Sequence, residues 1–424
     1  MKIRNIQARR IWDSRGRPTV EVEVHNDDGS MGVGIAPAGA SMGTREAVER
    51  RDGGKRFGGL DVMAALGGIE REIAPALIGR DVADQADIDA ALVALDGTPN
   101  KARLGGNALI ATSLAVLHAA AAHARQPLWR YLARGRPVQL PLPQVQIFGG
   151  GAHAGRRVDV QDFMVIATGA TTFAEAMGMT AEVYRAAGVI MAARGPLAGV
   201  ADEGGWWPGF ARNEEALDTL VAAIEKAGYV PGTQVAIALD IAASEFGRAG
   251  RYRLALENQA LDTDGLCEKL VRWTERYPIV SIEDPLAEDD EAGLAAFTRA
   301  VGHRLQVVGD DYLVTDAARV RHAAAHKVCN CALIKPNQAG TVTETLAALE
   351  AGQALGMGTI VSARSGETED VAIVHLATGW NAGQLKVGSF ARSERMAKWN
   401  EALRIESRPD APQGFAGCKV LAGR

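Results

Sequence analysis

The chain has 424 residues, of which 47% are hydrophobic and 23% are charged. This length exceeds what one hydrophobic core usually supports and predicts two domains, while the composition excludes intrinsic disorder. A net charge of −5 and an aromatic content of 5% argue against a nucleic-acid partner, which requires a basic surface and stacking side chains.

The first half of the chain predicts strands followed by helices. Residues 19–24 alternate between apolar and polar side chains with the period of a strand, and residues 26–29 have the composition of a hairpin turn. Helical patterns follow over residues 61–77 and 106–123. Residues 127–143 contain four prolines and are the predicted linker, so we expect an N-terminal domain over residues 1–135 and a C-terminal domain over residues 136–424.

The second half alternates short apolar runs with helical stretches, which indicates a parallel sheet of the length that a closed (β/α) barrel requires. The predicted strands cover residues 163–166, 235–239, 279–282, 306–308, 332–334 and 358–361. Charged side chains follow five of these runs, and in such barrels the carboxyl ends of the strands form the active site. The residues at this predicted rim are Asp240, Glu283, Asp310, Lys335 and Arg364.

Three acidic residues on this rim, Asp240, Glu283 and Asp310, predict a metal site. Their carboxylates would repel one another without a cation, and an all-oxygen ligand set favours Mg²⁺. Lys335 follows the next strand, where a bound dication would lower its pKa toward that of a general base. A lysine base beside a metal site predicts removal of a proton next to a substrate carboxylate.

The four cysteines have no spacing typical of zinc sites, and we expect them to be small apolar side chains in a reducing compartment. They are Cys267, Cys329, Cys331 and Cys418. The first residues lack the apolar segment of a signal peptide, and no stretch approaches the ~18 apolar residues of a membrane span. We therefore expect a cytoplasmic protein without a membrane partner.

Long motifs in the same order along the whole chain resemble the enolase family. They are Ala8–Gly16, Leu95–Thr98, Gly151–Ala154, Asp202–Gly205, Ala238–Asp240, Ser281–Asp284, Leu333–Gln338, Arg364–Asp370 and Arg392–Arg395. The resemblance implies an enolase-type α+β N-terminal cap domain followed by a (β/α)8-type barrel, and usually a homodimer or higher homo-oligomer. It also implies a small phosphorylated carboxylic acid as the substrate.

The resemblance implies a role for each matching site residue, with one or two Mg²⁺ ions per subunit. Asp240, Glu283 and Asp310 would bind the first ion, and Ser41 would help to bind the second beside the substrate. Lys335 would be the base at C2, and Glu203 the acid for the hydroxyl that leaves C3. His153, Arg364 and Ser365 would bind the phosphate, and Lys386 the carboxylate.

The sequence departs from the family around the implied acid. Asp162 stands where enolases have glutamate, and Ala363 stands where they have histidine. Because Asp162 is expected to be a catalytic residue beside Glu203, these changes favour a diverged member over compensated drift. The prediction is an enzyme resembling carboxyphosphonoenolpyruvate synthase of phosphinate natural-product biosynthesis, acting on a phosphorylated or phosphono carboxylic acid. For Arg156 and Arg157 two interpretations stay open, contact with an additional anionic group of the substrate or solvated surface charges.

Three alternatives stay open. The chain can be a true enolase that converts 2-phosphoglycerate to phosphoenolpyruvate. It can also be a catalytically impaired enolase that acts as a binding protein, although Lys335 and the three metal carboxylates argue against this alternative. A racemase acting on unphosphorylated acids is disfavoured because Arg364 and Ser365 are present.

Overall fold

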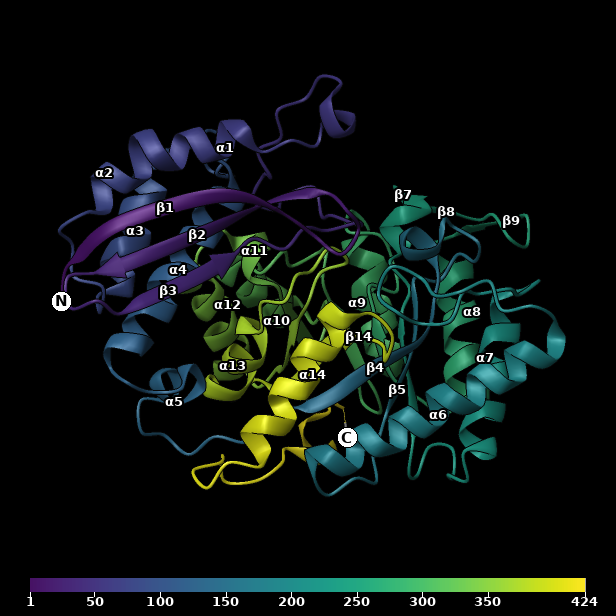
Figure 1. Cartoon of the computed structure of the whole chain (residues 1–424). Coiled ribbons are helices and arrows are strands. Elements are labelled where there is room, and N and C mark those ends of the chain that lie inside the picture. Colours follow the sequence, from purple (N-terminus) through teal and green to yellow (C-terminus); the bar gives the residue numbers. More distant parts are fainter. Residues whose placement is uncertain (424) are drawn as a thin grey trace.

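The computed structural model describes residues 1–423 and begins with a three-stranded antiparallel sheet (Figure 1). Its strands are β1 (Ile3–Trp12), β2 (Pro18–Asn26) and β3 (Met31–Ile35). The predicted strand over residues 19–24 lies in β2, and the predicted turn joins β2 to β3. A backbone hydrogen bond of 2.9 Å from Asn26 to Ser30 closes that turn, and Gly29 has the positive φ of +85° that the turn requires.

The N-terminal region contains five α-helices, and the first, second and fourth of them contact this sheet. They are α1 (Met63–Gly68), α2 (Ala74–Leu77), α3 (Gln85–Asp96), α4 (Gly106–His123) and α5 (Leu128–Ala133), with a π-helical turn at Ile69–Ile73 between α1 and α2. Both predicted helices are therefore present, and α4 has the predicted bounds. Helix α4 packs very closely against β2 and β3. Only glycine allows this approach at Gly32 and Gly34, because a Cβ atom there would lie 2.1 and 2.3 Å from the backbone of α4.

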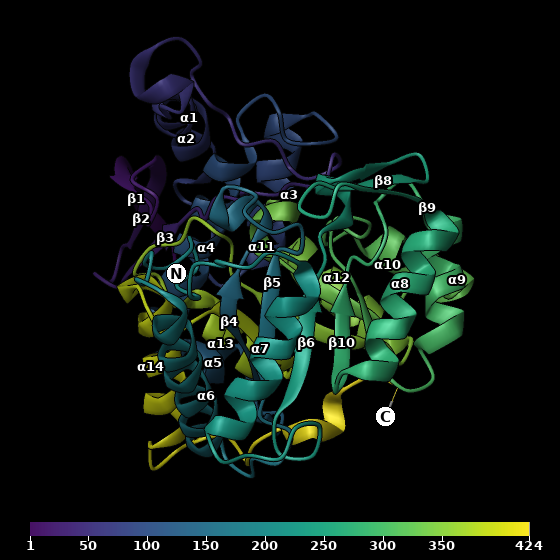
Figure 2. The same ribbon diagram turned by 90° about the vertical axis from the view of Figure 1, so that its right-hand side faces the viewer.

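A closed eight-stranded barrel forms the rest of the chain (Figure 2), which confirms the predicted α/β architecture. Its strands run around the barrel in the order β10-β11-β12-β13-β14-β4-β5-β6. They are β4 (Leu142–Gly149), β5 (Asp162–Ile166), β6 (Ala236–Asp240), β10 (Ile279–Glu283), β11 (Gln306–Gly309), β12 (Cys331–Ile334), β13 (Gly358–Ser362) and β14 (Gly383–Gly388). The sequence patterns predicted six of them and missed β4 and β14.

Strand β5 is antiparallel to both of its neighbours, so the prediction of an entirely parallel sheet is wrong. The reversal has a functional consequence. Asp162 begins β5 and pairs in register with Asp240, which ends β6. The amino end of β5 therefore lies on the same rim as the carboxyl ends of the parallel strands.

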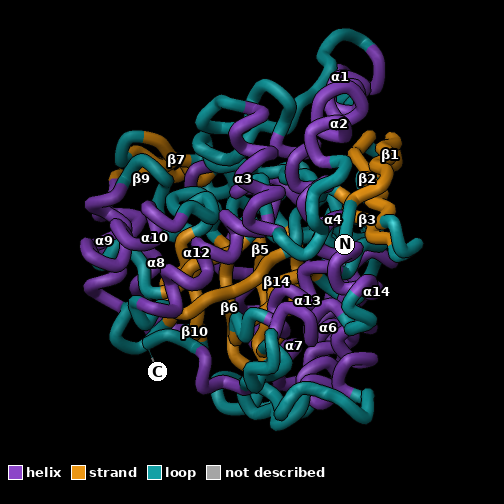
Figure 3. The backbone as a smooth tube through the Cα atoms, turned by 90° about the vertical axis from the view of Figure 1, so that its left-hand side faces the viewer, coloured by secondary structure: helices purple, strands orange, loops and turns teal. Residues whose placement is uncertain are grey.

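Helices surround the barrel, and a small sheet projects from its rim (Figures 2 and 3). The helices are α6 (Phe173–Arg194), α7 (Asn213–Lys226), α8 (Thr263–Arg276), α9 (Glu291–Val301), α10 (Ala317–His326), α11 (Pro336–Ala339), α12 (Val342–Ala354), α13 (Ala372–Gly379) and α14 (Ser393–Glu406). The small sheet contains β7 (Gly247–Arg248), β8 (Arg251–Leu254) and β9 (Gln259–Asp262). In residues 1–423, none of the helices has the length and apolar character needed to cross a membrane.

One hydrophobic core cluster contains residues of both the N-terminal sheet and the barrel. The predicted linker is partly ordered secondary structure, because α5 and the start of β4 lie inside residues 127–143.

Cys329 and Cys331 are buried as expected, whereas Cys267 and Cys418 are only half-buried, and all four are free thiols.

Candidate active site

The predicted rim residues do lie at one end of the barrel. Asp240, Glu283 and Lys386 belong to β6, β10 and β14, and Glu283 pairs in register with Asp240. Asp310 and Lys335 each follow the last residue of their strands, β11 and β12. Each of these side chains is at least nine-tenths buried, so their charges interact where water screens them little.

Lys386 is the centre of one half of the site. Its Nζ atom lies 2.9 Å from Asp240 Oδ2, 2.8 Å from Glu283 Oε2 and 3.4 Å from Asp162 Oδ2. Burial would lower the pKa of Lys386, but these carboxylates outweigh it and raise that pKa well above its usual value. The pKa of Glu283 is raised well above its usual range by burial and by the neighbouring Asp240. Lys386 is therefore a fixed ammonium between acidic groups.

Lys335 forms the other half of the site with Asp310. The Nζ atom of Lys335 donates a short hydrogen bond to Asp310 Oδ2, and Gln338 Nε2 donates to Asp310 Oδ1 at 2.9 Å. Burial alone would raise the pKa of Asp310 and lower that of Lys335, but their attraction reverses both directions. The protein's own groups thus raise the pKa of Lys335, so the lowering expected from the sequence depends entirely on a cation at Asp310.

The carboxylates on this rim have oxygens that fit a hard cation. Asp240 Oδ1 and Glu283 Oε1 are buried and have no hydrogen-bond partner among the described residues. Leaving buried carboxylate oxygens unpaired is costly, and a divalent cation is the ligand that oxygen donors without His or Cys favour. The donor set therefore fits Mg²⁺.

A second acidic group lies directly behind this rim. Oxygens of Asp284, Asp310 and Asp311 come within 4.8 Å of one another. Asp284 accepts the backbone N–H groups of both other residues at 2.8 Å, so its carboxylate fixes the turn after β11. Asp310 alone belongs to both groups, because its side chain also reaches Lys335. The sequence patterns did not assign a role to Asp284 or Asp311.

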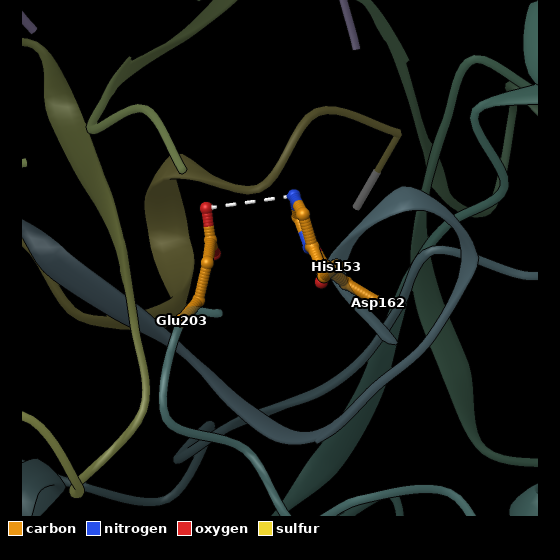
Figure 4. A group of neighbouring side chains, drawn as sticks. All are labelled: His153, Asp162 and Glu203. Atoms are coloured by element: carbon orange, nitrogen blue, oxygen red, sulfur yellow. Dashed lines mark hydrogen bonds and ion pairs between the residues drawn. The ribbon is translucent and has the colours of Figure 1, made fainter. Parts of the chain in front are cut away.

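A histidine joins the two implied catalytic carboxyl groups (Figure 4). His153 lies in a 3-10 turn (Gly151–Ala154), and its Nδ1 atom is 3.0 Å from Asp162 Oδ1. Its Nε2 atom lies 3.0 Å from Ser365 Oγ and 3.8 Å from Glu203 Oε1. Gln146 also donates to Asp162 Oδ1, so the shorter side chain of aspartate still has two partners.

Electrostatics separates these two carboxyl groups. Burial raises the pKa of Glu203, and His153 counters only part of that effect. Burial also opposes ionisation of Asp162, but His153 and Lys386 outweigh it and hold the pKa of Asp162 below its usual range. Burial would lower the pKa of His153, yet Glu203 and Asp162 raise it. Asp162 is thus the ionised partner and Glu203 the group poised to carry a proton.

Arg364 connects the barrel to the loop that carries Ser41. Its guanidinium donates to Glu46 at 2.9 and 3.2 Å, to Asn337 Oδ1 at 2.9 Å and to the Ser41 carbonyl at 3.0 Å. The side chain of Ser41 accepts a hydrogen bond of 3.3 Å from Gln161. The loop over residues 38–46 is therefore closed onto the barrel rim.

All eleven predicted site residues belong to one network of hydrogen bonds and ion pairs. Gln161 donates to Asp240 Oδ2 at 3.0 Å, and Gln338 donates to Glu46 Oε1 at 3.2 Å, which links the parts described above. Sequence reasoning gave no role to these three linking residues. The local contact of Glu46 could have been predicted, because a glutamate three residues after a glycine can accept the backbone N–H of that glycine, as Glu46 does from Gly43. Its pairing with Arg364 joins residues far apart in the sequence and could not be predicted.

Arg156, Arg157 and Ala363 do not share one environment. Arg156 has an exposed side chain that pairs with Glu245 at 2.8 Å, and Arg157 is exposed. Neither is part of the network that contains the predicted site residues. Ala363 is buried after β13, beside Arg364 and Ser365.

Comparison with known proteins gives consistent matches along nearly the whole chain. The family model described as "Enolase, N-terminal domain" matches residues 3–132, and that described as "Enolase, C-terminal TIM barrel domain" matches residues 137–423. The chain is 50% identical to "Enolase 1" of Desulfitobacterium hafniense over 96% of its own length and 93% of that protein. It is 49% identical to "Enolase" of Acidothermus cellulolyticus over 98% of its length and 96% of that protein.

These matches overturn one prediction. The interpretation as a diverged enzyme of phosphinate biosynthesis is wrong, because the relatives at about half identity over nearly full length are both named enolase. The physical reason is that aspartate can replace glutamate beside Glu203. Asp162 still contacts His153 and Gln146 despite its shorter side chain. With two family models and two such relatives in agreement, this chain belongs to the enolase family.

Proposed function

We propose that this chain removes water from 2-phosphoglycerate to form phosphoenolpyruvate. The observation that carries the proposal is the pairing of two buried groups in one network. Lys335 lies at the end of β12 beside Asp310, and Glu203 is a carboxyl group whose pKa burial raises. A base and an acid of these types are what removal of a proton and departure of a hydroxyl require. The enolases to which the chain is similar support the same reaction.

Mg²⁺ is the cofactor, as predicted from the sequence: the structure contains buried acidic groups that could hold a metal ion, one of them including Asp310, and the relatives are enolases. Asp240, Glu283 and Asp310 would hold the first ion, and Ser41 would contribute to a second. When bound, the cation stabilises the negative charge that develops on the substrate carboxylate. The unpartnered oxygens of Asp240 and Glu283 support this assignment of ligands.

The proton and the leaving group move in opposite directions. Neutral Lys335 takes the proton from C2 of the substrate, and the electrons of that C–H bond form the C2–C3 double bond. The C3–O bond breaks, and Glu203 gives its proton to the departing hydroxyl, which leaves as water. The raised pKa of Glu203 keeps the proton available for this transfer.

Cationic side chains would orient the substrate. Arg364, Ser365 and His153 would bind the phosphate, and the ammonium of Lys386 would bind the carboxylate. Asp162 would hold His153 with one ring nitrogen toward itself and the other toward Ser365, as their contacts of 3.0 Å support. Such positioning matters because small displacements of reacting groups are costly for the rate.

The remaining expectations complete the proposal. We propose a boundary between the cap domain (1–135) and the barrel domain (136–424), a homodimer or higher homo-oligomer, and a cytoplasmic location. The substrate and the absence of nucleic-acid or membrane partners follow from the same assignment.

The decisive experiment is a turnover assay. Purified protein with Mg²⁺ and 2-phosphoglycerate should produce phosphoenolpyruvate, which its ultraviolet absorbance reports, and chelation of the metal should stop the reaction. Folded protein that binds 2-phosphoglycerate but never turns it over would refute the proposal and favour a binding function.

A further inference from the structure

A cavity of about 410 Å³ lies at the junction of the N-terminal region and the barrel, beside the catalytic network, with which it shares Gln338. Its walls come from the end of the loop over residues 38–46, here called the first lid, from residues 99–101, from the turn into α10, and from α11 and α12. Helix α12 contacts α3 and α4, so helices of the N-terminal region and of the barrel meet at this junction (Figure 1). A volume of this size accepts a small metabolite.

Basic side chains dominate the lining. The charged residues are four basic ones, Arg45, Lys101, Arg319 and Arg321, and two acidic ones, Asp316 and Glu344. Both carboxylates already have partners. Asp316 accepts backbone N–H groups of Ala318 and Arg319 at the start of α10, and Glu344 accepts from Lys101 Nζ at 2.7 Å.

Three arginines therefore line the cavity without an ion pair among the described residues. Arg319 donates a hydrogen bond from Nε to the Tyr312 carbonyl, and its guanidinium lies 4.6 Å from the centre of the Tyr312 ring, so its terminal nitrogens are the donors left for a ligand. Burial and the nearby guanidinium of Arg45 lower the pKa of Arg319. Guanidinium groups gathered around one opening repel one another unless an anion lies between them, and their planar forks suit phosphate oxygens.

The cavity is separate from the catalytic site but adjoins it. Gln338 and Thr315 both line it, and they form the wall toward the catalytic residues. Gln338 donates to Asp310 Oδ1 at 2.9 Å, and the Thr315 hydroxyl accepts the N–H of Lys335 at 2.9 Å. None of the eleven catalytic and binding residues proposed above lines the cavity.

We propose that this cavity is a second anion site, which binds the phosphate group of a small phosphorylated metabolite through Arg45, Arg319 and Arg321. The phosphate accepts hydrogen bonds from the guanidinium groups, and the rest of the ligand lies toward Asn100 and Lys101. The site goes beyond the proposed reaction and does not depend on it. A bound phosphate links Arg45 in the first lid to α10 in the barrel.

Phosphate binding to the intact protein tests this site. Equilibrium dialysis with radiolabelled inorganic phosphate would compare wild-type protein with the single variants Arg321→Ala and Arg319→Ala. Each variant should weaken binding at one phosphate site by about tenfold or more, because each removes charge-assisted hydrogen bonds. Arg299→Ala, a surface arginine of α9, is the matched control and should bind as wild type does.

The outcomes are distinct. Loss of one phosphate equivalent in the Arg319 and Arg321 variants, with binding at the catalytic site retained, supports the proposal. Equal phosphate binding by wild type and both variants overturns it. Arg321 is exposed on α10, so Arg321→Ala should fold, and a thermal melt equal to that of wild type verifies this.

The ligand class is tested with one further probe, glycerol 3-phosphate, which competes against radiolabelled inorganic phosphate. Glycerol 3-phosphate that competes for this site more strongly than inorganic phosphate identifies an ester ligand, whereas equal competition identifies phosphate alone as the recognised group. Failure of both glycerol 3-phosphate and unlabelled inorganic phosphate to displace the label from this site overturns the proposal. These results are independent of turnover, so an inactive enzyme with an intact second site is distinguishable from an active enzyme without one.

Discussion

Replacing Lys335 with alanine tests the proposed reaction most directly, because the chemistry begins with proton transfer to its Nζ atom. Loss of a general base costs about 10²–10⁴-fold in rate, which corresponds to about 3–5 kcal/mol of barrier. The formation of phosphoenolpyruvate should fall by this factor. Exchange of the substrate C2 proton with deuterated solvent, followed by NMR in the presence of Mg²⁺, should fall with it.

The same substitution also perturbs stability, and the structure indicates by how much. Lys335 and Asp310 are both buried and paired, and removing one partner of a buried pair costs about 3–5 kcal/mol. Gln338 still donates to Asp310 at 2.9 Å in the variant, so we expect the lower end of this range. Urea unfolding of wild type and variant without metal measures the difference.

A matched control separates the two effects. Lys269 is a buried lysine of α8 that pairs with Glu257 at 2.7 Å, outside the catalytic network. Lys269→Ala should lose stability but keep turnover and proton exchange per folded molecule. The proposed role of Lys335 is refuted if Lys335→Ala exchanges the C2 proton as fast as wild type, or if Lys269→Ala loses exchange to the same extent.

The other predictions concern the acid, the histidine and the first lid. Glu203→Gln should slow phosphoenolpyruvate formation by about 10²-fold or more while C2 proton exchange persists, and loss of both would contradict separate acid and base roles. Asp162→Asn should lower the pKa of His153, measured by NMR titration, because it removes a carboxylate 3.0 Å away; an unchanged pKa would show that Glu203 alone sets it. The pKa of His153 is raised in the folded protein, so protonated His153 stabilises the fold fully below its unfolded pKa of about 6.5, and this stabilisation is lost as pH rises through the folded pKa. The difference in unfolding free energy between wild type and His153→Gln should therefore shrink at alkaline pH. A difference that grows with pH would contradict this direction. Glu46→Gln should raise KM and lower the free energy of unfolding by up to about 3–5 kcal/mol, because Arg364 loses its carboxylate partner; wild-type values of both would exclude a role in lid closure.

The residues after parallel strands could be predicted from sequence because strand and charge are both local signals. A buried apolar run followed at once by a carboxylate identifies Asp240, Glu283 and Asp310 without tertiary information. The carboxyl ends of parallel strands share one rim, so their convergence follows from the fold class alone. This is why those three positions needed no knowledge of a relative.

The direction of β5 could not be predicted, because an apolar run has no polarity in its composition. The apolar run Phe163–Ile166 is equally compatible with a parallel and an antiparallel strand. Its pairing with β4 and β6 determines the direction of the strand. Asp162 consequently lies at the first residue of its strand, before the apolar run, yet faces the catalytic rim. Its role came from the resemblance to a family and not from its position along the chain.

Strands β4 and β14 were missed because both carry polar residues toward the barrel interior. Gln144 in β4 and Gln384 in β14 hydrogen-bond to each other at 3.0 Å, and Gln384 also bonds to Gln306 in β11. Buried glutamines that satisfy one another interrupt the apolar pattern that marks a central strand. The prolines before β4 further favoured a linker, although Pro143 lies inside the strand itself.

In the proposed mechanism, metal binding and catalysis involve the same carboxylates, and the contacts of the two lysines give a physical reason. Asp310 raises the pKa of Lys335, and Asp240 with Glu283 raises that of Lys386, so the acidic rim holds both lysines as ammonium groups. A divalent cation shared by these three carboxylates would compete with the lysines for their charge. Lys335 would then lose the attraction that keeps it protonated and become a base, because a nearby positive charge disfavours its ammonium form. Lys386 would lose two carboxylate partners and have its charge available for the carboxylate of the substrate. Asp310 is a proposed metal ligand that also contacts Lys335. Lys335 would therefore become a base only when the cation is bound.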